Sequence, residues 1–241
     1  MVLIGCEKSG VVRDAFIKAG FAAVSCDLLP TESPGPHIVG DIVDVLKSRR
    51  WAFVGLHPNC RELCLSGNHK YAAGKPGHAA RLRAAAWTRD LWELAKQQSS
   101  RVYLENSANV LASLTDMPKR TQAVQPYDFG HDASKQTWLW LHGLPKLEPT
   151  KMVAPRLVCC GETLPDGVGK YGCPYCQGDK KPKMRWANQT DSGQNRLPPS
   201  ATRSADRAKT YQGIADAMVT QWRGTVSQKE SKPLGDNDDD G

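Results

Sequence analysis

The chain has 241 residues, of which 40% are hydrophobic, enough apolar material for one large α/β domain or one domain with an insertion. The net charge of +7 weakly favours a polyanionic partner. No segment is apolar enough to cross a bilayer, and the start MVLIGCEKSG acquires charge too early for a signal peptide. The composition therefore predicts a cytoplasmic protein without membrane association. In that compartment its eight cysteines are expected to serve metal binding or chemistry rather than disulfides.

The first half of the chain alternates between strand and helix patterns. Strands are expected at residues 2–6, 21–27, 51–56 and 101–106, and helices at residues 11–20 and 81–98. This alternation predicts a mostly parallel sheet with helices on both faces. In the second helix the buried stripe is expected to contain Leu82, Ala86, Leu91 and Leu94.

Polar residues fall where these strands end. A parallel sheet binds its ligands at the carboxyl ends of the strands. Glu7, Asp27, Cys60 and Glu105 all occupy such positions. The sequence therefore predicts that these four residues belong to one site.

The second half has a different character. Between residues 149 and 204 regular patterning fades, and a helix pattern returns only at 210–222. Residues 151–209 contain eleven lysines and arginines against five acids, and the same segment carries Tyr171, Tyr175 and Trp186. A solvated basic loop would also have this charge, but basic residues interleaved with aromatic ones favour contact with nucleic acid.

The loop Glu7-Lys8-Ser9-Gly10 joins the first strand to the first helix, and Asp27 ends the next strand. This arrangement binds nucleoside-bearing cofactors, because small residues let the backbone approach the ligand and the carboxylate accepts bonds from ribose hydroxyls. The loop lacks the GxGxxG pattern that cradles a diphosphate. The sequence therefore favours a cofactor without phosphates, S-adenosylmethionine (SAM), although an ordinary strand-to-helix turn could contain the same residues.

Cys60 stands in the loop His57-Pro58-Asn59-Cys60, directly after a strand. A buried packing cysteine is the commoner case, but a thiolate is also a soft nucleophile towards an electron-poor ring carbon. Glu105 would be a costly buried charge without a partner, and its carboxyl group could hydrogen-bond N3 and the exocyclic amine of a cytosine. Together they suggest covalent catalysis in which the thiolate adds to C6 and C5 takes a methyl group. Cys64 is expected to be a packing residue, or else a second thiol able to form a disulfide with Cys60.

Four segments resemble motifs of the DNA cytosine-5 methyltransferase family, in a reduced form similar to phage and prophage proteins. GCEKSGVVRDAF resembles the first motif, HPNC the Pro-Cys nucleophile motif, LENSANV the Glu-Asn-Val motif, and KTYQGIADAM the C-terminal motif that caps the cofactor. They follow the family's order. The resemblance implies a Rossmann-like SAM-dependent methyltransferase sheet with a small Cys-rich insert, acting on C5 of cytosine in DNA.

The resemblance also implies the residues of the site. Cys60 is expected to be the nucleophile and Glu105 its partner at the base. Asp27 and Asp41 fall where the family has its ribose and adenine contacts. The full set expected to bind the cofactor is Cys6, Glu7, Ser9, Gly10, Asp27, Asp41 and Pro58.

Two departures from the family pattern leave other functions open. Asn59 stands where the family has a second proline, and residues 121–130 contain no arginine where the family has Gln-x-Arg-x-Arg. That motif helps to orient the flipped base. A methyltransferase acting on free pyrimidine nucleotides and a catalytically inactive nucleic-acid-binding protein of the same fold are therefore the alternatives to DNA methylation.

Cys159, Cys160, Cys173 and Cys176 form a possible structural zinc site, because the CxxC pair precedes a Lys-rich turn. Adjacent side chains such as those of Cys159 and Cys160 normally diverge, so His131 or His142 could replace one of them. A metal would stabilise a segment too short to build its own core. The predicted organisation is a catalytic domain at 1–150 and 205–224, a basic zinc-knuckle-like insert for target recognition at 151–204, and a disordered acidic tail at 225–241.

Overall fold

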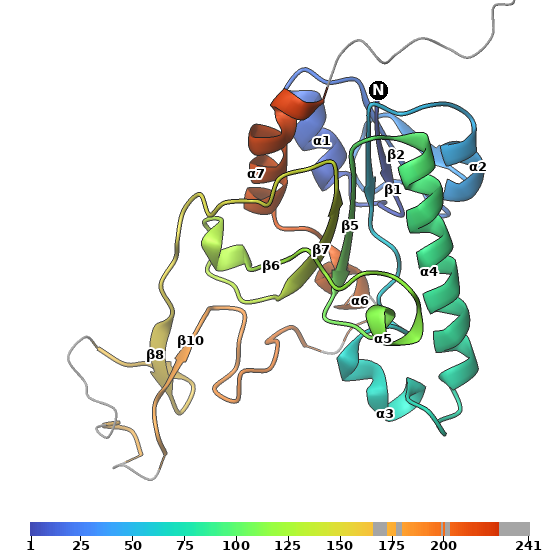
Figure 1. The fold of residues 1–241 in the computed structure, drawn as a ribbon. Coiled ribbons are helices and arrows are strands. Elements are labelled where there is room, and N and C mark those ends of the chain that lie inside the picture. Colours follow the sequence, from blue (N-terminus) through green and yellow to red (C-terminus); the bar gives the residue numbers. More distant parts are fainter. Residues whose placement is uncertain (166–172, 177–179, 199, 201–202, 227–241) are drawn as a thin grey trace, which may run out of the picture. The chain divides into compact units, whose positions relative to one another are not determined.

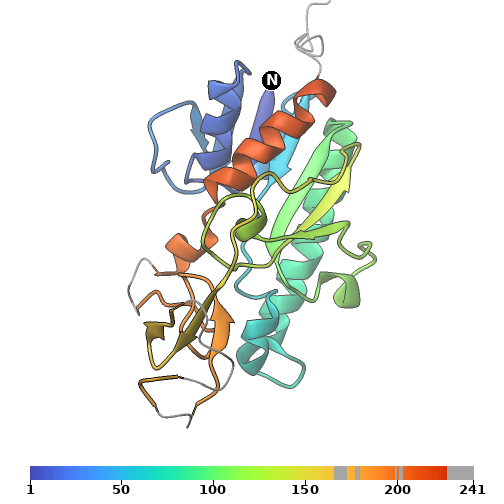
Figure 2. The same cartoon turned by 90° about the vertical axis from the view of Figure 1, so that its left-hand side faces the viewer.

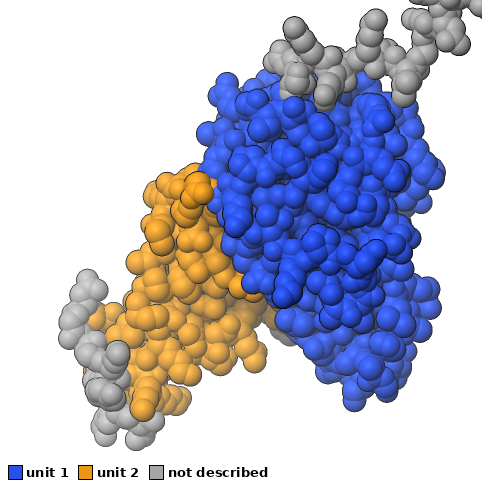
Figure 3. Space-filling view, in the orientation of Figure 1, with its two compact units in different colours: residues 1–124, 137–147, 215–241 blue, residues 125–136, 148–214 orange. Residues whose placement is uncertain are grey.

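The computed structural model describes residues 1–165, 173–176, 180–198, 200 and 203–226. The chain divides into two compact units, coloured separately in Figure 3. Unit 1 contains residues 1–124, 137–147 and the C-terminal residues from 215, and unit 2 contains residues 125–136 and 148–214. Most of the expected acidic tail, from residue 227 onward, lies outside the described residues.

Unit 1 is built on a seven-stranded sheet with the order β3-β2-β1-β4-β5-β7-β6. The five strands from β3 to β5 are parallel to one another, while β7 is antiparallel to both of its neighbours. The expectation of a mixed α/β fold with a largely parallel sheet is confirmed. The strands are β1 Val2–Gly5, β2 Ala23–Asp27, β3 His37–Val39, β4 Phe53–Leu56, β5 Val102–Ser107, β6 Gln122–Val124 and β7 Thr137–His142.

Helices cover both faces of this sheet (Figure 1). Helix α7 lies in front of the strands and α4 behind them in Figure 2. On the α7 side, aromatic rings of Phe16, Phe53, Tyr103 and Trp222 pack at centroid distances of 4.9–5.9 Å. The helices are α1 Val11–Lys18, α2 Ile42–Lys47, α3 Asn68–Tyr71, α4 His78–Gln98, α5 Leu111–Leu114 and α7 Gln212–Trp222, with 3₁₀ turns at Leu65–Gly67, Pro126–Asp128 and Arg223–Thr225.

Helix α4 buries a different stripe from the one expected. Leu82 is 45% exposed and Ala86 is also exposed, so the expectation for these two residues is wrong. Leu91 is buried as expected, and Leu94 packs partly buried against the core. The stripe contains two polar residues, which hides its period in the sequence; its members are Arg81, Ala85, Thr88, Leu91, Trp92 and Ala95.

Unit 2 contains a three-stranded antiparallel sheet with the order β10-β8-β9. Its elements are β8 Arg156–Cys159, β9 Glu162–Thr163, β10 Lys183–Arg185 and helix α6 Arg203–Ala208. Residues 125–136 belong to this unit as well. Ser134 and Asn188 exchange two hydrogen bonds of 2.9 Å, and Tyr127 stacks on Trp186 with centroids 4.2 Å apart. None of the helices in the described segments is long and apolar enough to cross a membrane.

Candidate active site and metal centre

The carboxyl edge of the unit 1 sheet has a switch point between β1 and β4. From β1 the chain proceeds to β2 and β3 on one side, and from β4 it proceeds to β5 on the other. In open α/β sheets the crevice outside such a point is the usual ligand site. The loop beginning at Cys6 leaves β1 here, and the loop beginning at His57 leaves β4.

Glu7 lies in the first of these loops and is almost fully buried, with 5% of its surface exposed. Its Oε1 accepts hydrogen bonds from Ser9 Oγ at 2.7 Å and from the Val12 amide at 3.2 Å. Its Oε2 is buried and has no hydrogen-bond partner among the residues that the structure describes. A buried carboxylate oxygen without a donor is costly. This arrangement can accept a hydrogen bond from a bound ligand.

Gly10 starts helix α1 with a φ of 78°, in the left-handed region. A Cβ at this position would lie 2.5 Å from the guanidinium of Arg13. That guanidinium is fully buried and donates to Ser25 Oγ at 3.1 Å and to the Ser33 carbonyl at 2.9 Å. Arg13 thereby orders the loop after β2. Sequence reasoning missed it, because an arginine on an amphipathic helix is usually exposed.

Asp27 and Asp41, two further residues expected to bind the cofactor, lie near Cys6. Asp27 Oδ1 accepts from the Leu29 amide at 3.0 Å, and Asp41 is the N-cap of α2, with Oδ1 accepting from the Val43 amide at 2.8 Å. Burial raises the pKa of the Cys6 thiol to about 12, with a further contribution from the negative charges of Asp27 and Asp41. Cys6 is therefore a neutral thiol in an acidic corner of the edge.

The expected nucleophile loop and the expected carboxyl strand lie side by side. Asn106 Nδ2 donates to the Pro58 carbonyl at 3.1 Å, which joins the ends of β4 and β5. Further along, the Leu65 amide donates to the Ala108 carbonyl and the Val110 amide to the Leu63 carbonyl. Segments 57–65 and 105–110 are therefore held together through three hydrogen bonds. Cys60 is partly exposed in the first segment, while Glu105 is buried in the second.

Asn59 does not disturb this loop. Its Oδ1 accepts a hydrogen bond from the Arg61 amide at 3.0 Å, a local turn that asparagine forms readily. The carbonyl of Cys60 accepts from the amides of Leu63 and Cys64, which closes the turn. The loop conformation is thus built without a second proline.

Two residues next to this loop, the buried Arg81 and the partly buried His57, were not expected from the sequence. Arg81 of α4 donates to the carbonyls of Glu62 and Cys64 and to Asn68 Oδ1. His57 lies 2.7 Å from the Tyr103 hydroxyl through Nε2. The apolar period of α4 placed Arg81 outside the stripe expected to be buried. His57 begins the segment HPNC, but only its Pro and Cys residues match the nucleophile motif.

The Sγ atoms of Cys159, Cys160, Cys173 and Cys176 in unit 2 all lie within 4.8 Å of one another, so the four could hold a metal ion. Cys159 Sγ lies 3.7 Å from that of Cys160 and 3.8 Å from that of Cys176. These separations are too long for a disulfide. They match the S–S edge of about 3.8 Å in a tetrahedron with metal–sulfur bonds of about 2.3 Å.

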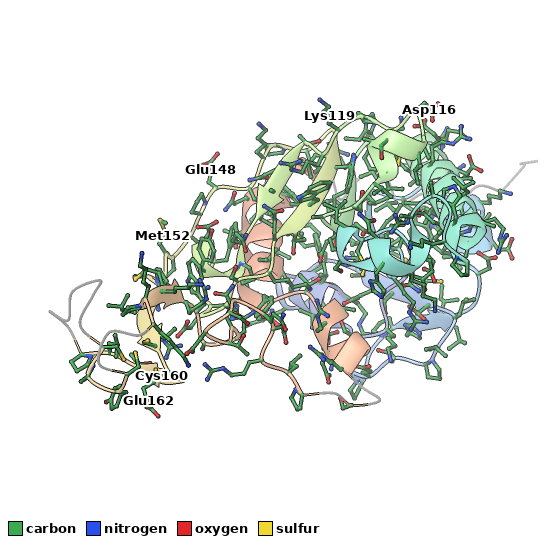
Figure 4. The ribbon with its side chains drawn as sticks, turned by 90° about the horizontal axis from the view of Figure 1, so that it is seen from below. Asp116, Lys119, Glu148, Met152, Cys160 and Glu162 are labelled. Atoms are coloured by element: carbon green, nitrogen blue, oxygen red, sulfur yellow. The ribbon has the colours of Figure 1, made fainter. Side chains whose placement is uncertain are left out.

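Cys159 and Cys160 converge because of a turn. They end β8 and begin its hairpin to β9, where Cys160 has a φ of 58° and Gly161 a φ of 85°. Figure 4 labels Cys160 beside Glu162 on this hairpin. The left-handed backbone of Cys160 brings both sulfurs to one side. His131 is engaged elsewhere in unit 2, since its Nε2 accepts from the Gly213 amide.

Basic residues line a hollow next to this cluster. A cavity of about 450 Å³ is lined by residues of β8, β10 and the connecting loops: Val158, Cys159, Lys180, Lys181, Lys183, Asp191 and Ser192. A hydrogen bond with the backbone of Lys180 lowers the pKa of Cys176 to about 7, while burial raises that of Cys159 to about 12. A metal ion bound by these cysteines would hold them as thiolates, so the difference between the two pKa values would no longer matter.

No protein-family model matches the chain, and no curated protein matches it.

Proposed function

We propose that the chain is a SAM-dependent methyltransferase that methylates C5 of cytosine in DNA through a covalent adduct with Cys60. The observation that carries the proposal is the joining of segments 57–65 and 105–110 at the ends of β4 and β5, next to the switch point of the sheet. A half-exposed thiol and a buried carboxyl group come from neighbouring strand ends. This pair suits attack on a flat, electron-poor ring.

The same edge suits a cofactor without phosphates. The unpartnered Oε2 of Glu7 can accept from the ammonium group of SAM, and the second oxygen of Asp27 can accept from ribose hydroxyls. Leu28 is 74% exposed directly after Asp27 and offers an apolar surface to a purine ring. When bound, SAM supplies an electrophilic methyl group. Lys8 is the single basic residue of the loop Glu7–Gly10, which fits a ligand without a diphosphate.

The protein residues have separate tasks in this reaction. The Cys60 thiolate adds to C6 of the cytosine. The Glu105 carboxyl group hydrogen-bonds N3 and the exocyclic amine, which draws electrons away from C6. Oγ of Ser107, on the same side of β5 as Glu105, is buried without a partner among the described residues and is a further group able to bond a ligand.

We propose zinc as the ion for the four cysteines of unit 2, because thiolates at tetrahedral spacing suit Zn²⁺. DNA is the proposed partner of the hollow lined by Lys180, Lys181 and Lys183, since closely spaced ammonium groups attract backbone phosphates. The target-recognition role assigned to this insert stays a prediction.

The test is to incubate the protein with tritiated SAM and DNA containing 5-fluorocytosine, which traps the adduct. We expect a labelled covalent complex with the wild type and with Cys64→Ser, the matched control, and none with Cys60→Ser. Glu105→Gln should lower the rate by about 10²–10⁴-fold, the usual contribution of a positioned acid or base.

Other outcomes assign a different function. Label in free deoxycytidine monophosphate but not in DNA would make the chain a nucleotide methyltransferase. DNA binding without SAM binding or label would identify it as an inactive nucleic-acid-binding protein. A covalent complex formed equally by Cys60→Ser would exclude Cys60 as the nucleophile.

A further inference from the structure

Three polar side chains form a row behind the proposed catalytic pair. The Tyr103 hydroxyl lies 2.7 Å from His57 Nε2, and His57 Nδ1 lies 3.5 Å from Glu105 Oε2. The side chains of His57 and Glu105 are only 11% and 7% exposed, and Tyr103 is fully buried. The row therefore joins the core of unit 1 to the carboxyl group at its edge.

The alternation of side chains along β5 and the pairing of β4 with β5 place these three side chains in a row. Tyr103 and Glu105 alternate with Leu104 in β5 and so face the same side of the sheet. His57 follows β4, whose Leu56 pairs with Leu104. Gly55 leaves space for the tyrosine ring, because a Cβ there would lie 2.4 Å from its Cε1. The close approach of Tyr103 and His57 therefore depends on a glycine in β4.

The protons in this row have few possible positions. Burial, then the charges of Glu105 and Glu7, raise the pKa of Tyr103 well above 10, so its phenol is neutral. If the phenol donates to Nε2, the neutral imidazole carries its proton on Nδ1, facing Glu105. If the imidazole is charged, both nitrogens donate, and the phenol oxygen accepts. In both of these states a proton on Nδ1 faces Oε2. In the third state the neutral imidazole donates from Nε2 to the phenol oxygen, and Nδ1 accepts from a protonated Glu105 carboxyl group.

We infer that His57 is the positioning residue of Glu105: it holds the carboxyl group through Oε2 and exchanges with it the proton that Glu105 gives to the cytosine ring. The inference rests on the proposed function. The imidazolium gives its Nδ1 proton to Oε2 and becomes neutral. The carboxyl group then gives a proton to N3 while the S–C6 bond forms and the C5=C6 electron pair shifts towards C4.

The reverse steps restore the row. Once C5 carries the methyl group, a water molecule acting as base removes the C5 proton, the C5=C6 bond forms again and the S–C6 bond breaks. N3 then returns its proton to the carboxylate, and the imidazole can take it up again. Tyr103 keeps its proton throughout and fixes the ring through Nε2. The contact of 3.5 Å is at the outer limit of a hydrogen bond, and such contacts commonly shorten when substrate binds.

The first test needs no activity. In protein with ¹⁵N-labelled histidine, the ring signals of His57, assigned with His57→Asn, should be those of the Nδ1–H form. In Glu105→Gln these signals should change towards a mixture of the two tautomers, because an amide can either accept from Nδ1–H or donate to Nδ1. Unchanged ring signals in Glu105→Gln would overturn the inference.

The second test uses the methylation assay. His57→Asn keeps a donor for Glu105 but cannot carry a proton, so kcat should fall about 10²-fold or more with KM for DNA unchanged, and the shape of the pH profile should change. Tyr103→Phe should lower kcat by a smaller factor. The exposed His69→Asn is the control with wild-type values. A wild-type kcat and pH profile in His57→Asn would refute the inference.

Failure of the proposed function would be recognised separately. In that case the wild type gives no trapped adduct on DNA, while the histidine ring signals still report on the link between His57 and Glu105.

Discussion

Tyr103 is the residue whose burial has the clearest consequence for stability. Its pKa is raised well above 10, whereas the unfolded chain exposes the phenol with an ordinary pKa near 10. Above about pH 10 the unfolded state therefore loses a proton that the folded state keeps. The stability present below that pH is lost as the pH rises, and the loss continues until the buried phenol ionises as well.

We expect the free energy of unfolding to fall in this range by up to about 1.4 kcal/mol per pH unit from this one group. Tyr103→Phe should remove that part of the slope. Urea unfolding between about pH 9 and about pH 11 measures it. Tyr175→Phe, at a position 59% exposed, is the control and should keep the wild-type slope. Equal slopes in both variants would contradict the prediction.

At the level of elements, helix α4 shapes the loop that carries Cys60. Arg81 is 3% exposed and donates to two carbonyls of that loop, those of Glu62 and Cys64, and to Asn68 Oδ1. An acceptor left buried without a donor costs about 1–3 kcal/mol. The helix thus fixes the loop by satisfying its carbonyl groups.

Arg81→Met should therefore destabilise the protein by about 2 kcal/mol or more and speed the alkylation of Cys60 by iodoacetamide. Urea unfolding and mass spectrometry of the labelled cysteines measure the two effects. Arg83→Met, on the exposed side of the same helix, should change neither. If both variants behave alike, Arg81 does not hold the loop.

At the level of the whole molecule, the two units are stabilised in different ways. Unit 1 has a sheet of seven strands and a large apolar core. In the described part of unit 2 the apolar side chains packed with the cysteine cluster are those of Leu157 and Leu164. A metal bound by the four thiolates would therefore contribute much of the stability of unit 2.

Protein purified without chelators should contain about one zinc ion per chain. Removing it should speed amide hydrogen exchange in β8 and β10 and leave the exchange of β1, β4 and β5 unchanged. Cys160→Ser should have the same effect, and Cys64→Ser, outside the cluster, should have none. Metal-free protein with full protection in β8 and β10 would disprove a structural ion.

The basic residues near the cluster give a prediction of their own. Neutralising Lys180, Lys181, Lys183 and Arg185 together should weaken DNA binding steeply and flatten its dependence on salt, because each phosphate contact releases counterions. SAM binding, measured by calorimetry, should not change. Replacing Lys18, Lys47, Arg50 and Lys75 of unit 1 is the charge-matched control. Unchanged DNA affinity in the first variant would exclude this surface.

The sequence by itself determined the local elements of unit 1 and the strand ends that carry polar residues. Strands 2–6, 21–27, 51–56 and 101–106 were found because a buried strand is a short apolar run, and that signal is local. The four cysteines were also recognised from spacing alone, although no spacing could show that Cys159 and Cys160 converge. That convergence depends on a left-handed residue in the β8–β9 hairpin.

Only the tertiary structure decided which strands pair and which side chains bond one another across elements. The antiparallel β6 and β7 were not expected. The segment TWLWLH forms β7 by pairing with β5, about 35 residues earlier in the chain, and β6 joins the sheet only through β7. Arg81 and His57 were missed for the same reason, because each contacts groups that are distant in sequence. Arg81 bonds the loop that carries Cys60, and His57 lies between Tyr103 and Glu105. Periodicity records which side of an element faces the core, whereas hydrogen bonds between elements are fixed only when strand order and register bring them together.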